Sequence, residues 1–388
     1  MQVLMPIKEQ LHVTIESVAF GGQGVARAGG LVIFVGFAAP GDVLRIEIVE
    51  RKKKFARGRL IKVIEPSPMR TEPLCPYYGR CGGCSYQHID YARQLDIKRR
   101  QIGEALERIG GLAKSAVLEV IPSPRTYAYR GKAELHAAGE AGRFRLGFMD
   151  ISGGRLVDIE RCAIMDETIN DRIREAREAG RVPQDPADLI FWSGPPAAAG
   201  EAISRTVKNK DFHVPRTGFF QTNLYLTDRM VDVVCGLIDR KVETIVDACC
   251  GSGLFSLFLS PYARRVVGIE INDQSVKYAR INARRHGVPN VEFIQGDVEE
   301  VLADRARLGE AVDLVLLDPP RAGLSAASLA AVWGLKALDI IYISCNPATQ
   351  ARDIKFLKER GYDLQSVQPL DMFAQTEHIE TVALLRLR

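Results

Sequence analysis

The 388-residue sequence lacks any run of about 18 consecutive apolar residues, the length that a membrane-spanning helix needs. It also lacks an apolar start, because Lys8 and Glu9 fall where a signal peptide requires hydrophobic residues. These absences predict a soluble, cytoplasmic protein with no membrane partner. Hydrophobic residues make up 46% of the chain, and its length exceeds one ordinary core, so we expect two or three globular domains.

Net charge is also low, at +4, but it is unevenly distributed along the chain. Residues 1–70 contain 11 lysines and arginines against 6 acidic residues, a balance of +5, which leaves −1 for the remainder. A basic N-terminal module on a near-neutral body suits a polyanionic partner, because neutralised phosphates release counterions.

Residues 11–64 consist of short β-rich runs separated by glycine-rich turns, the pattern of a small β-barrel. The stretches at 15–27 and 40–42 resemble a TRAM domain, an OB-like RNA-binding barrel, which we place at residues 1–66. A solvated hairpin also accounts for a lone run of positive charge. If the barrel binds RNA, one rim would be lined by Arg51, Lys52, Lys53, Lys54, Phe55, Arg57 and Arg59.

Cysteine is scarce, with eight in the chain, and in a reducing cytosol such residues are more often metal ligands or nucleophiles than disulfide partners. Three of them, Cys75, Cys81 and Cys84, lie close together, and Cys162 follows much later. The paired C-x2-C repeats of typical structural zinc sites are absent. Zinc stays open, but three clustered thiolates with one remote thiolate suit a 4Fe-4S cluster at least as well.

We expect residues 67–212 to form a small α+β domain around those cysteines. Residues 90–112 have apolar side chains at helical spacing and end at two glycines, so they predict an amphipathic helix. Residues 129–137 and 143–150 are typical of strands. Arg130 and Lys132 stand where they could contact phosphate, although surface solubility explains both equally well.

From about residue 213 onward strands alternate with helices, which predicts a Rossmann-like α/β domain. Residues 244–254 form an apolar strand that runs into a glycine turn, and Glu270 ends the next strand, where a carboxylate can hold ribose hydroxyls. Asp297 ends a third strand, within reach of an adenine edge. A dinucleotide dehydrogenase would share these features, so they do not decide the chemistry.

The later strand ends distinguish methyl transfer from hydride transfer. The fourth strand delivers Asp318-Pro319-Pro320-Arg321, a carboxylate on a rigid loop that is typical of methyltransferases. Amino-methylating enzymes usually follow the prolines with an aromatic residue, so Arg321 points away from them. The fifth strand ends at Cys345, and Glu380 precedes the last strand. Attack by Cys345 on carbon 6 of a uracil would activate carbon 5 for methylation, and Glu380 would then remove the carbon 5 proton.

The chain resembles the RNA uracil-5-methyltransferase family, in the subfamily with a TRAM domain and an iron-sulfur cluster. The motifs that carry the resemblance are FFQTN at 219–223, DPPR at 318–321, SCNP at 344–347 and HIE at 378–380. The resemblance implies a class I methyltransferase domain at 213–388, with Cys345 as nucleophile and Glu380 as base. It implies S-adenosylmethionine contacts for Gln221, Cys249, Glu270, Asp297 and Asp318, and a 4Fe-4S cluster on Cys75, Cys81, Cys84 and Cys162.

Two positions depart from the family pattern. An aromatic residue usually stands where this chain has Cys249, and often a polar residue where it has Leu254, so the packing of adenine or methionine is expected to differ. Cys235 and Cys250 are expected to be neutral packing residues.

Two other functions stay open. An RNA cytosine-5-methyltransferase also attacks carbon 6 with cysteine, but it commonly uses two catalytic cysteines, and this chain offers one. A non-catalytic iron-sulfur RNA-binding protein would need none of Cys345, Glu380 and Asp318. The expected partner is structured RNA, with 23S ribosomal RNA first and the T-loop of transfer RNA second, bound by a monomer.

Overall fold

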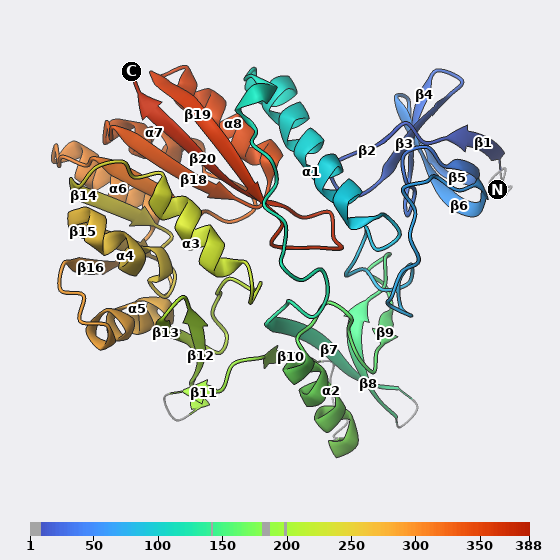
Figure 1. Cartoon of the computed structure of the whole chain (residues 1–388), viewed down its shortest axis with the longest axis horizontal. Helices are drawn as coiled ribbons and strands as arrows, with labels where there is room; N and C mark the ends of the chain where they lie inside the picture. Colours follow the sequence, from blue (N-terminus) through green and yellow to red (C-terminus); the bar gives the residue numbers. More distant parts are fainter. Residues whose placement is uncertain (1–8, 141–142, 181–186, 198–199) are drawn as a thin grey trace, which may run out of the picture.

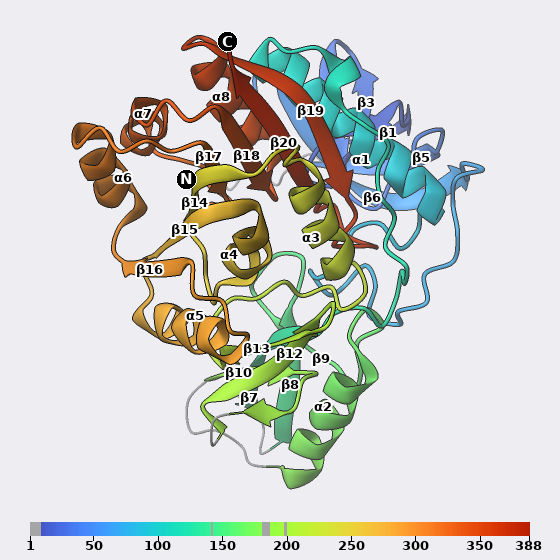
Figure 2. The ribbon, with the colours of Figure 1, turned by 60° about the vertical axis from the view of Figure 1, so that its left-hand side comes forward.

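The computed structural model describes residues 9–140, 143–180, 187–197 and 200–388. Figure 1 shows a β-barrel at upper right, a large sheet covered by helices at upper left, and a smaller α+β module below them. In Figure 2 the same module lies below the large sheet, with α2 at its lower edge. Within the described ranges, no helix is long and apolar enough to cross a membrane.

The N-terminal strands form a six-stranded sheet in the order β1-β5-β6-β4-β3-β2. Its two outermost strands are consecutive in the chain and are separated by only Ile15 and Glu16, so the sheet curls back on itself as a barrel. Inward side chains such as Val35 and Ile46 are fully buried in its core, which confirms the expected β-barrel. The strands are β1 (Gln10–Thr14), β2 (Ser17–Val18), β3 (Gly24–Ala28), β4 (Leu31–Val35), β5 (Val43–Arg51) and β6 (Phe55–Glu65).

The C-terminal part contains a seven-stranded sheet in the order β16-β15-β14-β17-β18-β20-β19, in which only β20 runs antiparallel to its neighbours. Every residue of β17 and β18 is buried, as expected for continuous apolar runs in a parallel sheet covered on both faces. The predicted Rossmann-like methyltransferase fold is thus confirmed. The strands are β14 (Val242–Ala248), β15 (Ala263–Glu270), β16 (Val291–Gln295), β17 (Leu314–Leu317), β18 (Asp339–Ser344), β19 (Tyr362–Leu370) and β20 (Glu380–Leu387).

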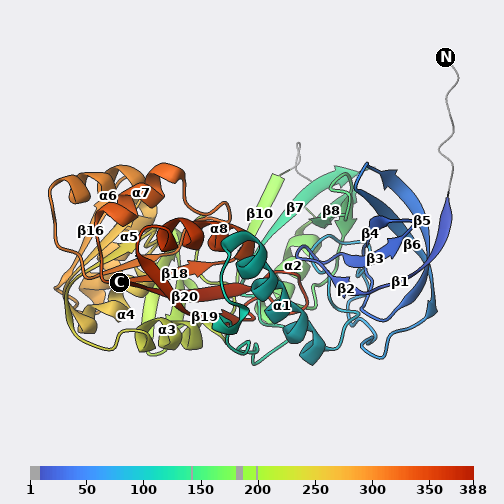
Figure 3. The same cartoon turned by 90° about the horizontal axis from the view of Figure 1, so that it is seen from above.

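Helices cover both faces of this sheet. Side chains of α3, α4 and α5 share one core with it, and those of α6, α7 and α8 share a second core. Figure 3 shows α6, α7 and α8 on one side of the strands and α3 and α4 on the other. The helices are α3 (Thr227–Gly236), α4 (Leu254–Leu259), α5 (Asp273–Arg285), α6 (Val298–Arg307), α7 (Ala326–Gly334) and α8 (Pro347–Lys358), with a 3-10 turn, η4 (Ser260–Tyr262), after α4.

The middle module is built on a four-stranded sheet, β10-β7-β8-β9, with α2 packed against it. A second, three-stranded sheet, β11-β12-β13, leads into the C-terminal domain. The strands expected at 129–137 and 143–150 are observed as β7 and β8. The elements are β7 (Lys132–Glu140), β8 (Arg143–Met149), β9 (Leu156–Asp158), α2 (Glu167–Ala179), β10 (Ala187–Trp192), β11 (Pro196–Ala197), β12 (Ala202–Val207) and β13 (Lys210–Pro215).

The helix expected at 90–112 is observed as α1 (Tyr91–Ala105), followed by a π-helical turn, η1 (Leu106–Gly110), and a short 3-10 turn, η2 (Lys114–Ala116). The helix ends at Gly111, which has the left-handed φ of 59° that glycine adopts without strain. Ile102 and Leu106 belong to the same core as β17 and β18. Packing therefore crosses the expected domain limits, and the boundaries at 66 and 212 stay a prediction.

Candidate active site and cysteine pocket

Most of the predicted cofactor residues lie at the edge of the C-terminal sheet where its parallel strands end. Ala248, the last residue of β14, pairs with the residues just before Glu270 and Asp318. Because these strands are parallel, Cys249 follows at the same edge, between the two carboxylates. Asp297 comes two residues after β16, the strand beside β15. The register of the sheet brings these four side chains to one edge.

The carboxylate of Glu270 is held by main-chain amides. The N–H of Gly251 donates to one of its oxygens (3.0 Å), and the N–H of Asn272 donates to the other (2.8 Å). Gly251 lies in a turn where Cys249 has the left-handed φ of 65°, which is uncommon for a residue other than glycine. Such backbone strain is typical of ligand-binding turns. The turn and the carboxylate are therefore oriented before any ligand binds.

Asp297 and Gln221 both lie outside the regular strands. Asp297 is exposed and caps α6, accepting the N–H groups of the two following glutamates (2.8 and 3.4 Å). Gln221 is buried after β13, and its main-chain oxygen accepts a hydrogen bond from Arg205 (3.4 Å). The neighbouring Asn223 donates to the carbonyl of Met372 (3.1 Å), which ties the Gln221 segment to the chain leading to Glu380.

Two carboxyl groups at this edge, those of Asp318 and Asp247, have raised pKa values. Burial, followed by the negative charge of Asp247, raises the pKa of Asp318 to about 7. Asp247 itself is completely buried, and burial raises its pKa to about 7, although Ser256 donates to one of its oxygens. Its other oxygen has no partner among the described residues. An orphaned buried oxygen beside several carboxylates suits a cationic ligand, and Asp247 was missed by the sequence analysis.

Cys345 and Glu380 are brought together by the antiparallel strand β20. Ser344 at the end of β18 pairs with Thr381 at the start of β20. In an antiparallel ladder the next residue of one strand faces the preceding residue of the other, so Cys345 lies opposite Glu380. The Thr381 hydroxyl fastens this end by donating to the carbonyl of Ser344 (2.9 Å). Asn346 then caps α8 through the N–H of Ala348 (3.1 Å).

The surroundings raise the pKa of both proposed catalytic residues, Cys345 and Glu380. Burial raises the pKa of the Cys345 thiol to about 11, and the nearby Glu380 and Asp318 raise it as well, whereas the guanidinium of Arg321 opposes them. Burial, followed by the charge of Asp318, raises the pKa of Glu380 well above its usual value. Arg321 is the cation of this otherwise acidic site, a role that the sequence analysis did not assign to it.

The 371–376 segment before Glu380 is anchored to α1. Lys98 and Asp371 form an ion pair in which both side chains are completely buried, and the lysine also donates to the carbonyl of Phe373 (3.2 Å). Gln94 and Gln375 exchange hydrogen bonds of 3.0 and 3.1 Å. These contacts join residues more than 270 positions apart, and the sequence pattern of the helix carried no signal for them.

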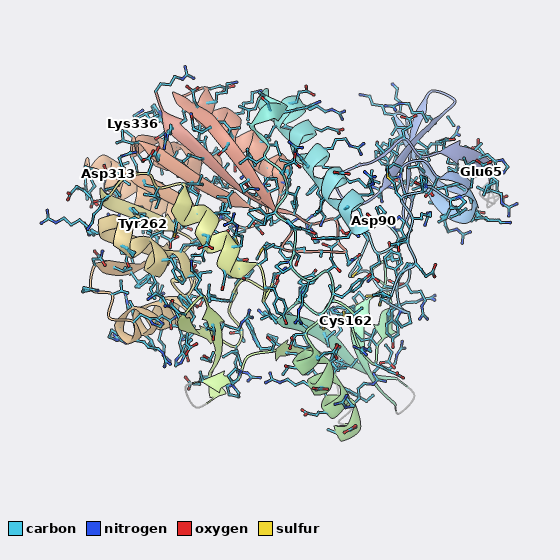
Figure 4. All side chains as sticks on the ribbon, in the orientation of Figure 1. Glu65, Asp90, Cys162, Tyr262, Asp313 and Lys336 are labelled. Atoms are coloured by element: carbon cyan, nitrogen blue, oxygen red, sulfur yellow. The ribbon has the colours of Figure 1, made fainter. Side chains whose placement is uncertain are left out.

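The four predicted cluster ligands, Cys75, Cys81, Cys84 and Cys162, line one enclosed pocket of about 50 Å³ together with Arg130. Figure 4 places Cys162 near the centre of the molecule, above α2. Burial raises the pKa of Cys162 to about 11, with further contributions from Cys75 and Cys81. In the described part of the chain, no three His, Cys, Asp or Glu side chains converge closely enough to hold a metal ion.

A short extended segment connects this pocket to the Gln221 region. On one side, the N–H groups of Tyr129 and Arg130 donate to the carbonyl of Ile164, which follows Cys162 (3.0 and 2.9 Å). On the other side, the N–H of Gly131 donates to the carbonyl of Thr222 (2.7 Å). Main-chain hydrogen bonds therefore link the cysteine pocket to the segment that carries Gln221 in two steps.

Cys249 and Leu254, the two positions that depart from the family pattern, are both shielded from solvent to a large extent. Leu254 is buried in the core beneath α4, so it packs against protein and not against solvent. Burial raises the pKa of Cys249 to about 12, and Asp318, Glu270 and Asp297 contribute to that rise. Cys250 is buried in the same core as Leu254, and Cys235 packs against that core, as expected.

Comparison with known proteins agrees with this geometry. Residues 201–388 match the tRNA (Uracil-5-)-methyltransferase family, and residues 8–61 match the TRAM domain. An uncharacterized RNA methyltransferase of Halalkalibacterium halodurans is 31% identical, over 97% of this chain and 97% of the relative. One from Gloeobacter violaceus is 34% identical, over 97% and 96%. The chain belongs to the RNA uracil-5-methyltransferase family.

Members of this family are S-adenosylmethionine-dependent RNA methyltransferases, so the protein is an enzyme of that class. The crystal structure of the Pyrococcus abyssi tRNA (uracil-54, C5)-methyltransferase in complex with S-adenosyl-L-homocysteine is similar across 97% of this chain and 100% of that one. Its TM-score is 0.75 and its sequence identity is 26%. The similarity extends over the TRAM domain, the middle module and the methyltransferase domain together.

Proposed function

We propose that the enzyme transfers a methyl group from S-adenosylmethionine to carbon 5 of a specific uridine in structured RNA, through a covalent adduct with Cys345. The observation that carries this proposal is the pairing of Ser344 with Thr381, which sets Cys345 opposite Glu380. Both residues lie beside Asp318 at the edge where cofactor residues gather. A cytosine-5-methyltransferase commonly needs a second catalytic cysteine, and a binding protein has no need of this arrangement.

The reaction needs two protein groups. The Cys345 thiolate adds to carbon 6 of uracil, and the ring electrons move to carbon 5 and its neighbouring carbonyl. Carbon 5 then takes the methyl group that S-adenosylmethionine supplies, and S-adenosylhomocysteine is left as the other product. Glu380 removes the remaining proton from carbon 5, the double bond re-forms, and the thiolate leaves carbon 6. The proton that the ring loses ends on Glu380.

The acidic edge would bind the cationic cofactor and set the protonation of the catalytic pair. Burial is the main cause that raises the pKa values of Asp318, Asp247 and Glu380, and the charge of a neighbouring carboxylate adds to it. The positive charge of S-adenosylmethionine would lower these pKa values and so favour the carboxylate form of Glu380 that acts as a base. Arg321 favours the thiolate form of Cys345. Gln221, Cys249, Glu270, Asp297 and Asp318 are the proposed cofactor contacts.

We further propose that Cys75, Cys81, Cys84 and Cys162 hold a 4Fe-4S cluster. The four thiols line one small pocket, and several of them raise one another's pKa. A 4Fe-4S cluster is held by four cysteine thiolates, which is the set of side chains that this pocket offers. Bound in this pocket, the cluster would order the loops that carry the four cysteines and would take no part in methyl transfer.

Ribosomal RNA of the 23S type is the proposed substrate, bound by a monomer with domains at 1–66, 67–212 and 213–388. The T-loop of transfer RNA is the second candidate. It is supported by the similarity to the Pyrococcus abyssi enzyme, which acts on uracil 54 of transfer RNA. The same catalytic pair would serve either RNA, because base chemistry is common while RNA shape selects the target.

The deciding experiment uses labelled S-adenosylmethionine and two separate RNA pools, undermethylated ribosomal RNA and undermethylated transfer RNA. Labelled 5-methyluridine from either pool supports the chemistry and identifies the substrate class, whereas labelled 5-methylcytidine or no label overturns it. Glu380→Gln should still transfer the methyl group but remain attached to the RNA, because the adduct cannot resolve. Cys345→Ala should neither attach nor methylate.

A further inference from the structure

A groove of about 870 Å³ lies between the β-barrel and the middle module. One wall comes from the barrel strands β4 and β6 and carries Phe34, Arg57 and Arg59. The other wall comes from the chain around Arg80 and from the β8–β9 hairpin, which carries Arg155. Figures 1 and 3 show these parts of the barrel and the module next to each other. The groove is lined by neither the cysteine thiols nor the catalytic residues.

The groove is strongly basic. Five arginines line it, against two aspartates, Asp150 and Asp158. Asp158 is already paired with Arg177 (2.6 Å), which lies outside the lining. One oxygen of Asp150 accepts hydrogen bonds from Ser152 and the Gly154 N–H (2.8 and 3.0 Å), within its own turn. Five arginines against two aspartates in the lining give the groove a positive balance that suits a polyanion.

Arg57 of the barrel wall can turn toward such a ligand at little cost. It is half exposed and pairs with Glu50 (3.1 Å), whose side chain is itself 38% exposed. An exposed ion pair of this kind contributes only about 0–1 kcal/mol, so exchanging the carboxylate for a phosphate is inexpensive. Arg59 is 61% exposed, but its partner Glu47 is buried, so we expect this pair to stay in place while the guanidinium adds positive charge to the groove.

Apolar surface accompanies the charge. Phe34 is partly exposed in the groove and packs edge-on against Phe55, with ring centroids 5.9 Å apart. Val49 and Ile151, on opposite walls, are 59% and 54% exposed. Aromatic and apolar side chains between arginines are the arrangement with which proteins bind single-stranded nucleic acid, whose unpaired bases are free to stack.

We propose that this groove between the barrel and the middle module binds a single-stranded stretch of the substrate RNA, away from the reacting uridine. The arginines contact its phosphates, and a base packs against Phe34. This inference rests on the proposed function for its ligand, RNA. It goes beyond the basic rim expected from Arg51 to Arg59, because the groove joins Arg57 and Arg59 of that rim to arginines of the middle module.

The test measures binding of a fluorescent single-stranded oligoribonucleotide, without S-adenosylmethionine, over a series of salt concentrations. Arg57→Ala and Arg155→Ala remove one cation from each wall. Each should weaken binding and lower the slope of log affinity against log salt by about 0.7, and the double variant by about 1.4. Arg264→Ala is the matched control. Arg264 is also an exposed arginine paired with a glutamate, but it lies at the start of β15 in the C-terminal sheet and does not line the groove.

A second variant separates stacking from charge. Phe34→Leu keeps this groove position apolar but removes the ring, so affinity should fall about fivefold or more with the salt slope unchanged. The proposal would be wrong if neither Arg57→Ala nor Arg155→Ala changes the salt slope, or if they lose no more RNA affinity than Arg264→Ala. Equal competition by a duplex of the same sequence would overturn it too. If the enzyme forms 5-methyluridine but the arginine variants leave the salt slope unchanged, only the groove is refuted. If the arginine variants change the slope but no 5-methyluridine forms, only the proposed reaction is refuted.

Discussion

The strand-end edge of the C-terminal sheet, where the proposed catalytic residues lie, and the cysteine pocket of the middle module both gather side chains that lie far apart in the sequence. At the edge, strand register places Cys345 opposite Glu380 and Cys249 between two carboxylates. In the pocket, the cysteines come from loops outside the regular strands and are positioned by turns and long-range packing. We therefore expect the edge to keep its arrangement without a ligand and the pocket to depend on what it binds.

The largest expected effect tests whether chemistry belongs to the edge alone. Cys345→Ala should lower methylation on the order of 10⁴-fold or more, because the covalent step is lost. Bound iron and the folded state should be unchanged. Cys84→Ala should do the reverse, lowering iron content and stability while leaving detectable methylation, measured per folded molecule. If folded Cys84→Ala is as inactive as Cys345→Ala, the pocket takes part in the reaction.

The second effect concerns the anchor of the catalytic segment. Lys98→Ala leaves the buried Asp371 carboxylate without its counterion. The free energy of unfolding, measured in urea, should fall by about 3–5 kcal/mol. The double variant Lys98→Ala/Asp371→Asn should recover part of that loss, since no charge is then buried. If the single variant costs less than about 1 kcal/mol, this ion pair does not hold the segment.

A smaller effect probes the link between the two regions. The hydroxyl of Tyr129 donates to the carbonyl of Ala374 (2.8 Å), inside the protein. Tyr129→Phe strands that carbonyl, so unfolding should become easier by about 1–3 kcal/mol. Tyr262→Phe, at a partly exposed turn of the sheet domain (Figure 4), is the control and should change stability by less than about 0.5 kcal/mol. If both variants lose the same free energy of unfolding, the hydrogen bond between Tyr129 and Ala374 does not stabilise the protein specifically.

The smallest effect concerns the charge balance at Cys345. Because burial raises the pKa of this thiol to about 11, its alkylation by iodoacetamide should accelerate about tenfold per pH unit up to that value. Arg321→Ala removes the cation that favours the thiolate, so alkylation near pH 8 should slow by up to about fivefold. Peptide mass spectrometry follows Cys345 separately from the other cysteines. A faster reaction in Arg321→Ala would reverse the assigned role of Arg321.

Much of the fold and the site was predictable because the information is local. Short β-rich runs separated by glycine-rich turns indicated the barrel, and apolar runs such as Leu314–Leu317 indicated strands of the C-terminal sheet. Residues that follow such runs must reach the same sheet edge, which is why Glu270, Asp318 and Cys345 could be assigned to one site. Asp247 escaped notice because it lies inside a strand, where its orphaned oxygen is invisible until the neighbours are placed.

The sequence by itself determined the barrel, the alternating sheet domain and the set of reactive side chains, since periodicity and turn residues act over short stretches. Tertiary structure alone decided how β20 enters between β18 and β19, how α1 is anchored by the Lys98–Asp371 ion pair, and how the four cysteines share a pocket. It also created the groove lined by Arg57 and Arg155. These features depend on contacts between distant segments, whose free energy is set by packing in three dimensions and leaves no periodic signal in the chain.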